Sequence, residues 1–145
     1  MLRFMEKLLL PVLCIGLVVG ATACAKKAAE TPAAAPAGVS VTGVDLGSSV
    51  GSDKRVSETR GDFGPKDVIY ASVLTSGSSA STVLKARWTY QDGQVVDESE
   101  QTIAPTGDAA TEFHVSKADG WPVGKYKVEV LQDGNPVQSK EFEVK

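Results

Sequence analysis

Apolar and polar residues alternate with a period of two through most of the chain from Val39 onward. The clearest segment is 83–90, in which one set of side chains is apolar and the other is largely polar. The apolar set is Leu84, Ala86, Trp88 and Tyr90, and the polar set is Lys85, Arg87 and Thr89. Successive side chains of a strand point to opposite faces, so this segment predicts a strand with one face on a core and the other in water.

The same alternation recurs in segments 112–116, 125–130 and 141–145, whereas 68–74 is apolar on both faces and predicts a central strand. No amphipathic helix of useful length is predicted between these segments. The predicted strands are 39–46, 54–60, 67–75, 82–90, 94–103, 110–116, 124–132 and 137–144.

Turn residues separate the predicted strands. Asp92-Gly93 and Asp133-Gly134 each lie between two strand patterns. Asp-Gly favours a hairpin because its backbone tolerates positive φ. Short strands with regular turn signals predict an all-β fold, an antiparallel sandwich of about 7–8 strands.

The segment Asp119-Gly-Trp-Pro-Val-Gly-Lys-Tyr-Lys-Val128 resembles the start of a late strand in immunoglobulin-like domains. In that family a Gly-x-Tyr motif, here ending at Tyr126, places the tyrosine at a corner where its hydroxyl bonds back to the chain. The family's cysteine two residues later is replaced here by Val128, and the resemblance implies Trp88 as the core tryptophan. It implies an immunoglobulin-like sandwich over 39–145 and says nothing about activity.

Residues 1–23 have the layout of a secretory signal peptide. Arg3 and Lys7 give a positive start, Leu8–Gly20 is uncharged and mostly apolar, and small residues follow. The alternative is an uncleaved transmembrane helix, because Leu8–Ala25 spans 18 residues without a charge. Pro11 and the weakly apolar end of this run favour the cleaved signal.

Ala21-Thr22-Ala23-Cys24 resembles the lipobox of bacterial lipoproteins, in which small residues precede an invariant cysteine. In that family the cysteine receives a diacylglycerol and the signal peptide is cut just before it, here between Ala23 and Cys24. The family usually has leucine where this chain has Ala21. The resemblance implies a lipid anchor at Cys24, and two or three acyl chains hold a protein firmly to a membrane. The other interpretations of Cys24 are an ordinary small apolar residue and a disulfide with Cys14.

Residues 24–38 are rich in alanine and proline, which predicts a disordered, semi-extended tether rather than a folded segment. In the lipoprotein family an aspartate after the cysteine commonly retains the protein in the inner membrane. This chain has Ala25 there, so the resemblance implies the outer membrane of a bacterial cell envelope. The chain also resembles bacterial lipoproteins that carry one immunoglobulin-like domain.

Composition limits the chemistry that the predicted domain can carry. Both cysteines lie in the first 24 residues, so residues 39–145 cannot form a disulfide or a thiolate metal site. The balance of 15 basic and 18 acidic residues, without a basic stripe, predicts no nucleic-acid partner. The single histidine, His114, excludes a multi-histidine metal site, and no calcium loop or Gly-x-Ser-x-Gly motif is present. We therefore predict no metal, no cofactor and no catalytic residue.

Three functional hypotheses follow from these features. The first is a non-catalytic module, anchored to a membrane by lipid, that binds a protein or glycan in the envelope. The second is an envelope inhibitor or secretion accessory that acts through loops, and the third is an enzyme. The contact candidates for the first two are the loops 76–81 and 104–110 and an exposed Trp121, although Trp121 also fits a cap on the end of the core. An acidic patch at Asp97, Glu98 and Glu100 is interpreted as serving solubility and edge protection.

Overall fold

The computed structural model describes residues 38–145, which form eight β-strands in two sheets, with no helix in that range. The strands are β1 (Ser40–Gly47), β2 (Asp62–Phe63), β3 (Ile69–Ser76), β4 (Thr82–Tyr90), β5 (Gln94–Ile103), β6 (Ala109–Val115), β7 (Gly124–Gln132) and β8 (Asn135–Val144). The predicted leader, Cys24 and the tether up to residue 37 lie outside the described residues. The prediction of an all-β fold is confirmed for the described part of the chain.

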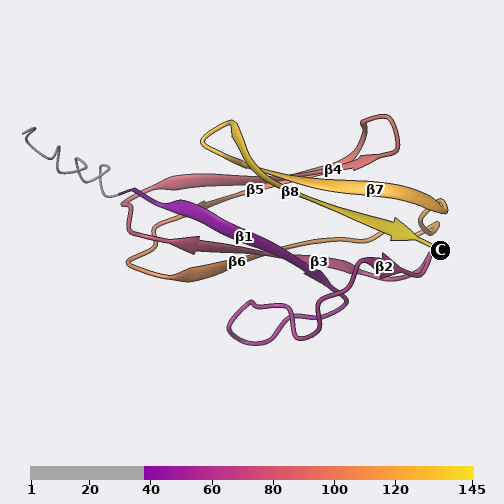
Figure 1. Ribbon diagram of the computed structural model, residues 1–145, viewed down its shortest axis with the longest axis horizontal. Coiled ribbons are helices and arrows are strands. Elements are labelled where there is room, and N and C mark those ends of the chain that lie inside the picture. The colour runs from indigo at the N-terminus through magenta and orange to yellow at the C-terminus, as the bar shows by residue number, and fades with distance from the viewer. Residues whose placement is uncertain (1–37) are drawn as a thin grey trace, which may run out of the picture. The chain divides into compact units, whose positions relative to one another are not determined.

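The two sheets face each other as a sandwich (Figure 1). The smaller sheet has the order β1-β3-β6, which confirms β3 as a central strand, and the larger has the order β2-β8-β7-β4-β5. Neighbouring strands are antiparallel except β2, which runs parallel to the end of β8. Immunoglobulin-like sandwiches divide their strands in the same way, with A, B and E in one sheet and C, F and G in the other. Here β1, β3 and β6 take the first set of positions, and β4, β7 and β8 take the second.

The core lies between the sheets and is built from the alternating positions that the sequence indicates. Trp88 is fully buried and lies opposite Val128 across the β4–β7 pair. Its indole meets the Phe142 ring edge to face at 5.9 Å, and Phe142 stacks on Tyr126 at 5.3 Å. Aromatic pairs in these geometries add to the stabilisation that burial alone provides. This layer of rings connects β4, β7 and β8 on the inner face of the larger sheet.

Tyr126 forms the corner that the resemblance implies. Its hydroxyl donates a hydrogen bond to the backbone oxygen of Pro122 at 2.7 Å, four residues back along the chain. The ring is 2% exposed, so the bond satisfies a polar group that would otherwise be buried alone. The bond fixes the segment before β7 against the core.

The predicted strand 54–60 is wrong. Residues 48–61 form an irregular excursion with a single bridge between Val50 and Val56 and a tight reversal in which the Gly51 N–H donates to Arg55 O at 2.8 Å. The excursion folds back on the end of β1, where a side chain at Gly47 would collide with Val56. The alternation around Val56 contains too few apolar residues to cover a sheet. The short β2, which the pattern missed, instead closes the edge beside β8.

Both predicted hairpins are present, but the two Gln-Asp-Gly triplets make different turns. Asp133 and Gly134 are the two central residues between β7 and β8, with φ of 50° and 85°, as a two-residue hairpin requires. Between β4 and β5 the loop has three residues, and positive φ occurs at Gln91 (43°) and Gly93 (97°). The identity of the triplets therefore reflects shared turn chemistry rather than a shared structure.

Candidate interaction surfaces

Two of the candidate contact loops lie together at one end of the sandwich. We call this the proximal end, made by Val39 and the loops 77–81 and 104–108, because β1 begins there. Ser78 pairs with Thr106, and the Ser79 N–H donates to Pro105 O at 3.0 Å. These bonds join the connection between β3 and β4 to the connection between β5 and β6. Sequence reasoning named both loops but gave no reason to expect them side by side.

Trp121 lies at the opposite, distal end, which we define by the hairpin 91–93, the segment 116–123 and Lys145. Its side chain is buried, with 4% exposed, and its indole N–H donates to the backbone oxygen of Asp67 at 3.0 Å. The ring meets Tyr126 edge to face at 5.6 Å. The expectation of an exposed aromatic at Trp121 is therefore corrected. The residue caps the core, and its indole offers no free face to a partner.

A shallow polar hollow opens at the distal end, with a volume of 580 Å³. Its lining residues are Gln91, Asp92, Gly124, Lys125, Tyr126, Lys127 and Glu141. Gly124 leaves room for Tyr90, whose hydroxyl donates to Val123 O at 3.1 Å and accepts a bond from Gln91 Nε2 at 2.8 Å. The hollow offers amide, ammonium and carboxylate groups, which suits a ligand rich in hydrogen-bonding groups. Sequence reasoning missed it because it depends on the register that places Tyr90 opposite Tyr126.

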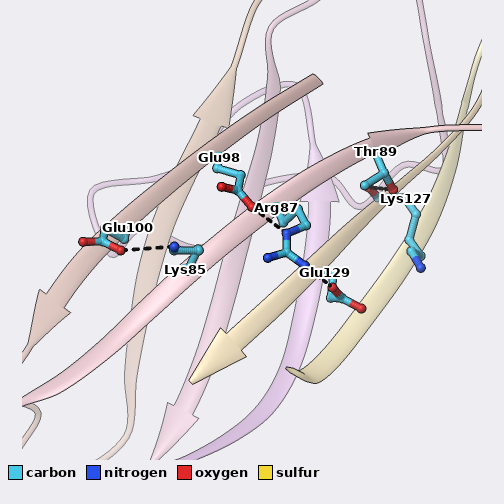
Figure 2. Close-up of polar contacts among 7 residues, drawn as sticks. All are labelled: Lys85, Arg87, Thr89, Glu98, Glu100, Lys127 and Glu129. Atoms are coloured by element: carbon cyan, nitrogen blue, oxygen red, sulfur yellow. Dashed lines mark hydrogen bonds and ion pairs between the residues drawn. The ribbon is translucent and has the colours of Figure 1, made fainter. Parts of the chain in front are cut away.

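Opposite charges alternate across the outer face of the larger sheet (Figure 2). Arg87 on β4 lies between two carboxylates, with its Nε 2.5 Å from Glu98 on β5 and its Nη1 3.5 Å from Glu129 on β7. Lys85 pairs with Glu100 at 3.5 Å in the next row. The hydrogen bond from Arg87 lowers the pKa of Glu98, and the same bond raises the pKa of Arg87. Charges matched in this way suit a solvated face, and each exposed pair adds little stability.

The structure divides the predicted acidic patch. Glu98 and Glu100 face outward and meet the cations of β4, whereas Asp97 lies opposite Trp88 and therefore on the inner side of β5. Across residues 38–145 no group of three or more acidic, histidine or cysteine side chains is placed to hold a metal ion. The three carboxylates are therefore not one site.

His114 lies on β6 with its side chain 60% exposed, as its alternation predicts. Its Nδ1 lies 2.6 Å from Glu112 Oε1, and both residues help to line a small hollow of 160 Å³ together with Ser99 and Gln101. A serine, a histidine and a glutamate near one another are the residue types of a nucleophilic triad. The Ser99 hydroxyl is buried and has no hydrogen-bond partner within the described range, so no serine–histidine bond is formed there.

No helix within residues 38–145 has the length and apolar character needed to cross a membrane.

No known family model matches this chain, and no curated protein matches its sequence. The fold is that of an immunoglobulin-like β-sandwich, and several solved structures resemble it. An immunoglobulin-like protein from Pseudomonas aeruginosa has 16% identity and a TM-score of 0.49, over 75% of this chain and 98% of that one. A CARDB domain from Pyrococcus furiosus in complex with di-metal ions has 11% identity and a TM-score of 0.47, over 74% of this chain and 88% of that one.

The alkylpurine DNA glycosylase AlkC from Pseudomonas fluorescens, bound to DNA containing an abasic site analogue, is also similar in structure. It has 15% identity and a TM-score of 0.49, over 74% of this chain. This chain spans 30% of the length of that glycosylase. None of these identities is high enough to carry a ligand or an activity from those proteins to this one.

Proposed function

We propose that the protein is a lipid-anchored component of the bacterial cell envelope whose immunoglobulin-like sandwich makes non-catalytic contacts with an envelope protein or glycan. The observation that carries the anchoring is the lipobox-like segment ending at Cys24, which stands directly after an apolar run. The absence of any cysteine from residues 39–145 supports the same role, because Cys24 then has no disulfide partner in the domain. Ala25 favours the outer membrane.

The arrangement of the domain supports a role in contact rather than in turnover. If Cys24 is held at a membrane, residues 25–38 form the tether, with a reach of about 46–50 Å when fully extended. The tether joins the domain at the proximal end, so the distal hollow lies at the end away from the attachment.

Labelling of cells that express the full chain with a tagged palmitate tests the anchoring. Wild-type protein is expected to take up the label, and Cys24→Ser is expected to lack it because the variant has no thiol to receive the lipid. Cys14→Ser is the matched control and is expected to be labelled like wild type. Equal labelling of Cys24→Ser and wild type, or no labelling of wild type, would contradict the proposal.

One structural observation favours the second candidate function, an inhibitor or secretion accessory. The loops 77–81 and 104–108 form one joined surface at the proximal end, and paired loops on a sandwich are a common contact device. Purified full chain would then inhibit an envelope hydrolase, and Ser79→Pro, which removes the N–H donated to Pro105, would weaken the inhibition. A lack of inhibition across a panel of envelope proteases and glycan hydrolases would count against the inhibitor role and would favour the non-catalytic binding module.

A further inference from the structure

β6 is an outer strand of the smaller sheet and pairs with β3 alone. Gln101 on β5, in the other sheet, donates from its side-chain amide to Glu112 O at 2.6 Å, so this carbonyl points away from β3. Backbone groups alternate in direction along an antiparallel strand. The N–H groups of Ala110, Glu112 and His114 and the C=O groups of Ala110 and His114 therefore form the free edge, whereas Gln101 occupies the Glu112 carbonyl. Thr111 and Phe113 bond to β3.

This edge differs from the other outer strands of the described sandwich. β1 and β5 carry bulges at Thr42 and Val96, and β2 has only two residues. β8, which β2 covers only at Glu143 and Val144, carries a bulge at Val137. Bulges and short strands are the usual means by which a sheet edge is made unsuitable for pairing. β6 keeps an uninterrupted register of seven residues with β3.

The smaller sheet has three strands, because β5, the strand between β4 and β6 in the sequence, pairs with β4 in the larger sheet. Immunoglobulin-like domains of the constant type have a fourth strand, D, beside the strand that corresponds to β6. Here residues 104–108 lead directly from β5 to β6, and no strand within residues 38–145 pairs with β6 on the side away from β3. The hollow of 160 Å³ borders this position, and the buried Ser99 hydroxyl that lines it has no partner among the described residues.

We infer that this edge receives an extended, basic segment of a partner protein, which adds as a fourth strand beside β6. The charge of the site argues for a basic segment. Asp97 is half-buried on the inner side of β5, two residues before Ser99, which lines the hollow. Glu112 on β6 contributes a second carboxylate, 25% exposed, whose Oε1 lies 2.6 Å from His114 Nδ1. Backbone bonds supply the affinity in strand addition, and side-chain pockets and charges supply the choice of partner.

The inference names the partner class for the contact in the proposed function, but it does not depend on the lipid anchor. A failure of strand addition would leave the behaviour of Cys24→Ser unchanged. The experiments can therefore reject strand addition at β6 and lipid anchoring at Cys24 independently. A partner glycan at this edge is the competing outcome, since a glycan offers no backbone ladder.

The test uses the full chain in nonionic detergent and a synthetic peptide of alternating lysine and threonine, Lys-Thr-Lys-Thr-Lys-Thr. Amide hydrogen exchange is followed by NMR as the peptide is added. The N–H groups of Ala110, Glu112 and His114 are expected to exchange fast without peptide and about tenfold more slowly at 90% occupancy, roughly in proportion to the free fraction. Thr111 and Phe113 are protected throughout and report that the strand remains folded.

Two variants separate backbone pairing from charge. Glu112→Pro removes an N–H that β3 does not use and is expected to abolish the protection, whereas the matched Glu112→Ala keeps that N–H and is expected to retain most of it. Asp97→Asn is expected to weaken binding about fivefold or less. Absence of protection, equal protection by an alternating glutamate–threonine peptide, or equal binding by Glu112→Pro would each overturn the inference.

Discussion

Tyr126 holds the distal end of the sandwich together through one hydroxyl. The bond to Pro122 fixes the turn before β7, and the ring touches Trp121, Phe142 and Tyr90. Burial raises the pKa of Tyr126 above its ordinary 10.0, and the nearby Tyr90 adds to the effect. Because the ionised form cannot donate to Pro122, the same residue links the stability of this end to alkaline pH.

The variant Tyr126→Phe is expected to lower the free energy of unfolding by about 1–2 kcal/mol, because Pro122 O loses its donor. A group whose folded pKa is raised contributes stability below its unfolded pKa and loses it as pH rises through the folded pKa. Wild type should therefore lose stability above pH 10, and the variant should lose less over that range. Urea unfolding at pH 7 and at pH 10.5 measures both effects. Identical pH dependence in the two proteins would contradict this role of the hydroxyl.

Trp121→Ala is expected to lower the free energy of unfolding by about 3–5 kcal/mol, since it empties a buried position. Val123→Ala removes a side chain that is 64% exposed and is expected to change stability by about 0.5 kcal/mol or less. Urea unfolding can be followed by the fluorescence of Trp88, which both variants retain. Equal stability of the two variants would mean that Trp121 is not part of the core.

At the scale of elements, the hairpins and loops depend on a few backbone positions. Gly134 has φ of 85° with open space around its Cβ position. Gly77 has φ of 101°, and a Cβ there would lie 2.3 Å from the Gly38 backbone oxygen. A side chain at Gly134 would strain only the backbone. A side chain at Gly77 would also collide with Gly38, in the segment that leads into β1.

Gly134→Ala is therefore expected to cost about 1–2 kcal/mol through left-handed backbone strain alone. Gly77→Ala carries the same strain and a collision with Gly38, so its loss of stability should be the larger of the two. Thermal unfolding of both variants measures the difference. A smaller effect at Gly77 than at Gly134 would show that the chain before β1 does not pack against this loop.

The charged rows of the larger sheet make a prediction about acid titration. Arg87→Ala removes the hydrogen bond that lowers the pKa of Glu98, so this pKa should rise toward its ordinary 4.5. Lys85→Ala removes only the weaker attraction between Lys85 and Glu98, so it should raise the pKa of Glu98 less. Carboxyl NMR titration gives both values. The stability that this contact contributes is present at neutral pH and is lost as pH falls through the pKa of Glu98 in the folded protein.

At the scale of the whole molecule, the period-two pattern identified the strands that bury one apolar face, because burial and alternation have the same cause. It failed at 54–60, where Val56 alone cannot cover a sheet, and at β2, which is held by pairing with β8 rather than by its own pattern. The distal hollow and the free edge of β6 come from register and strand order. No local pattern in the sequence predicts the distal hollow or the free edge of β6.

We propose Cys24 as the first residue of the mature protein and the site of its lipid. The most direct measurement is mass spectrometry of the protein purified from membranes, with sequencing of its N-terminal peptide. The expected result is a mature chain that begins at Cys24 and carries a thioether-linked diacylglycerol on that residue. A chain that retains residues 1–23, or that has an unmodified Cys24, would contradict it.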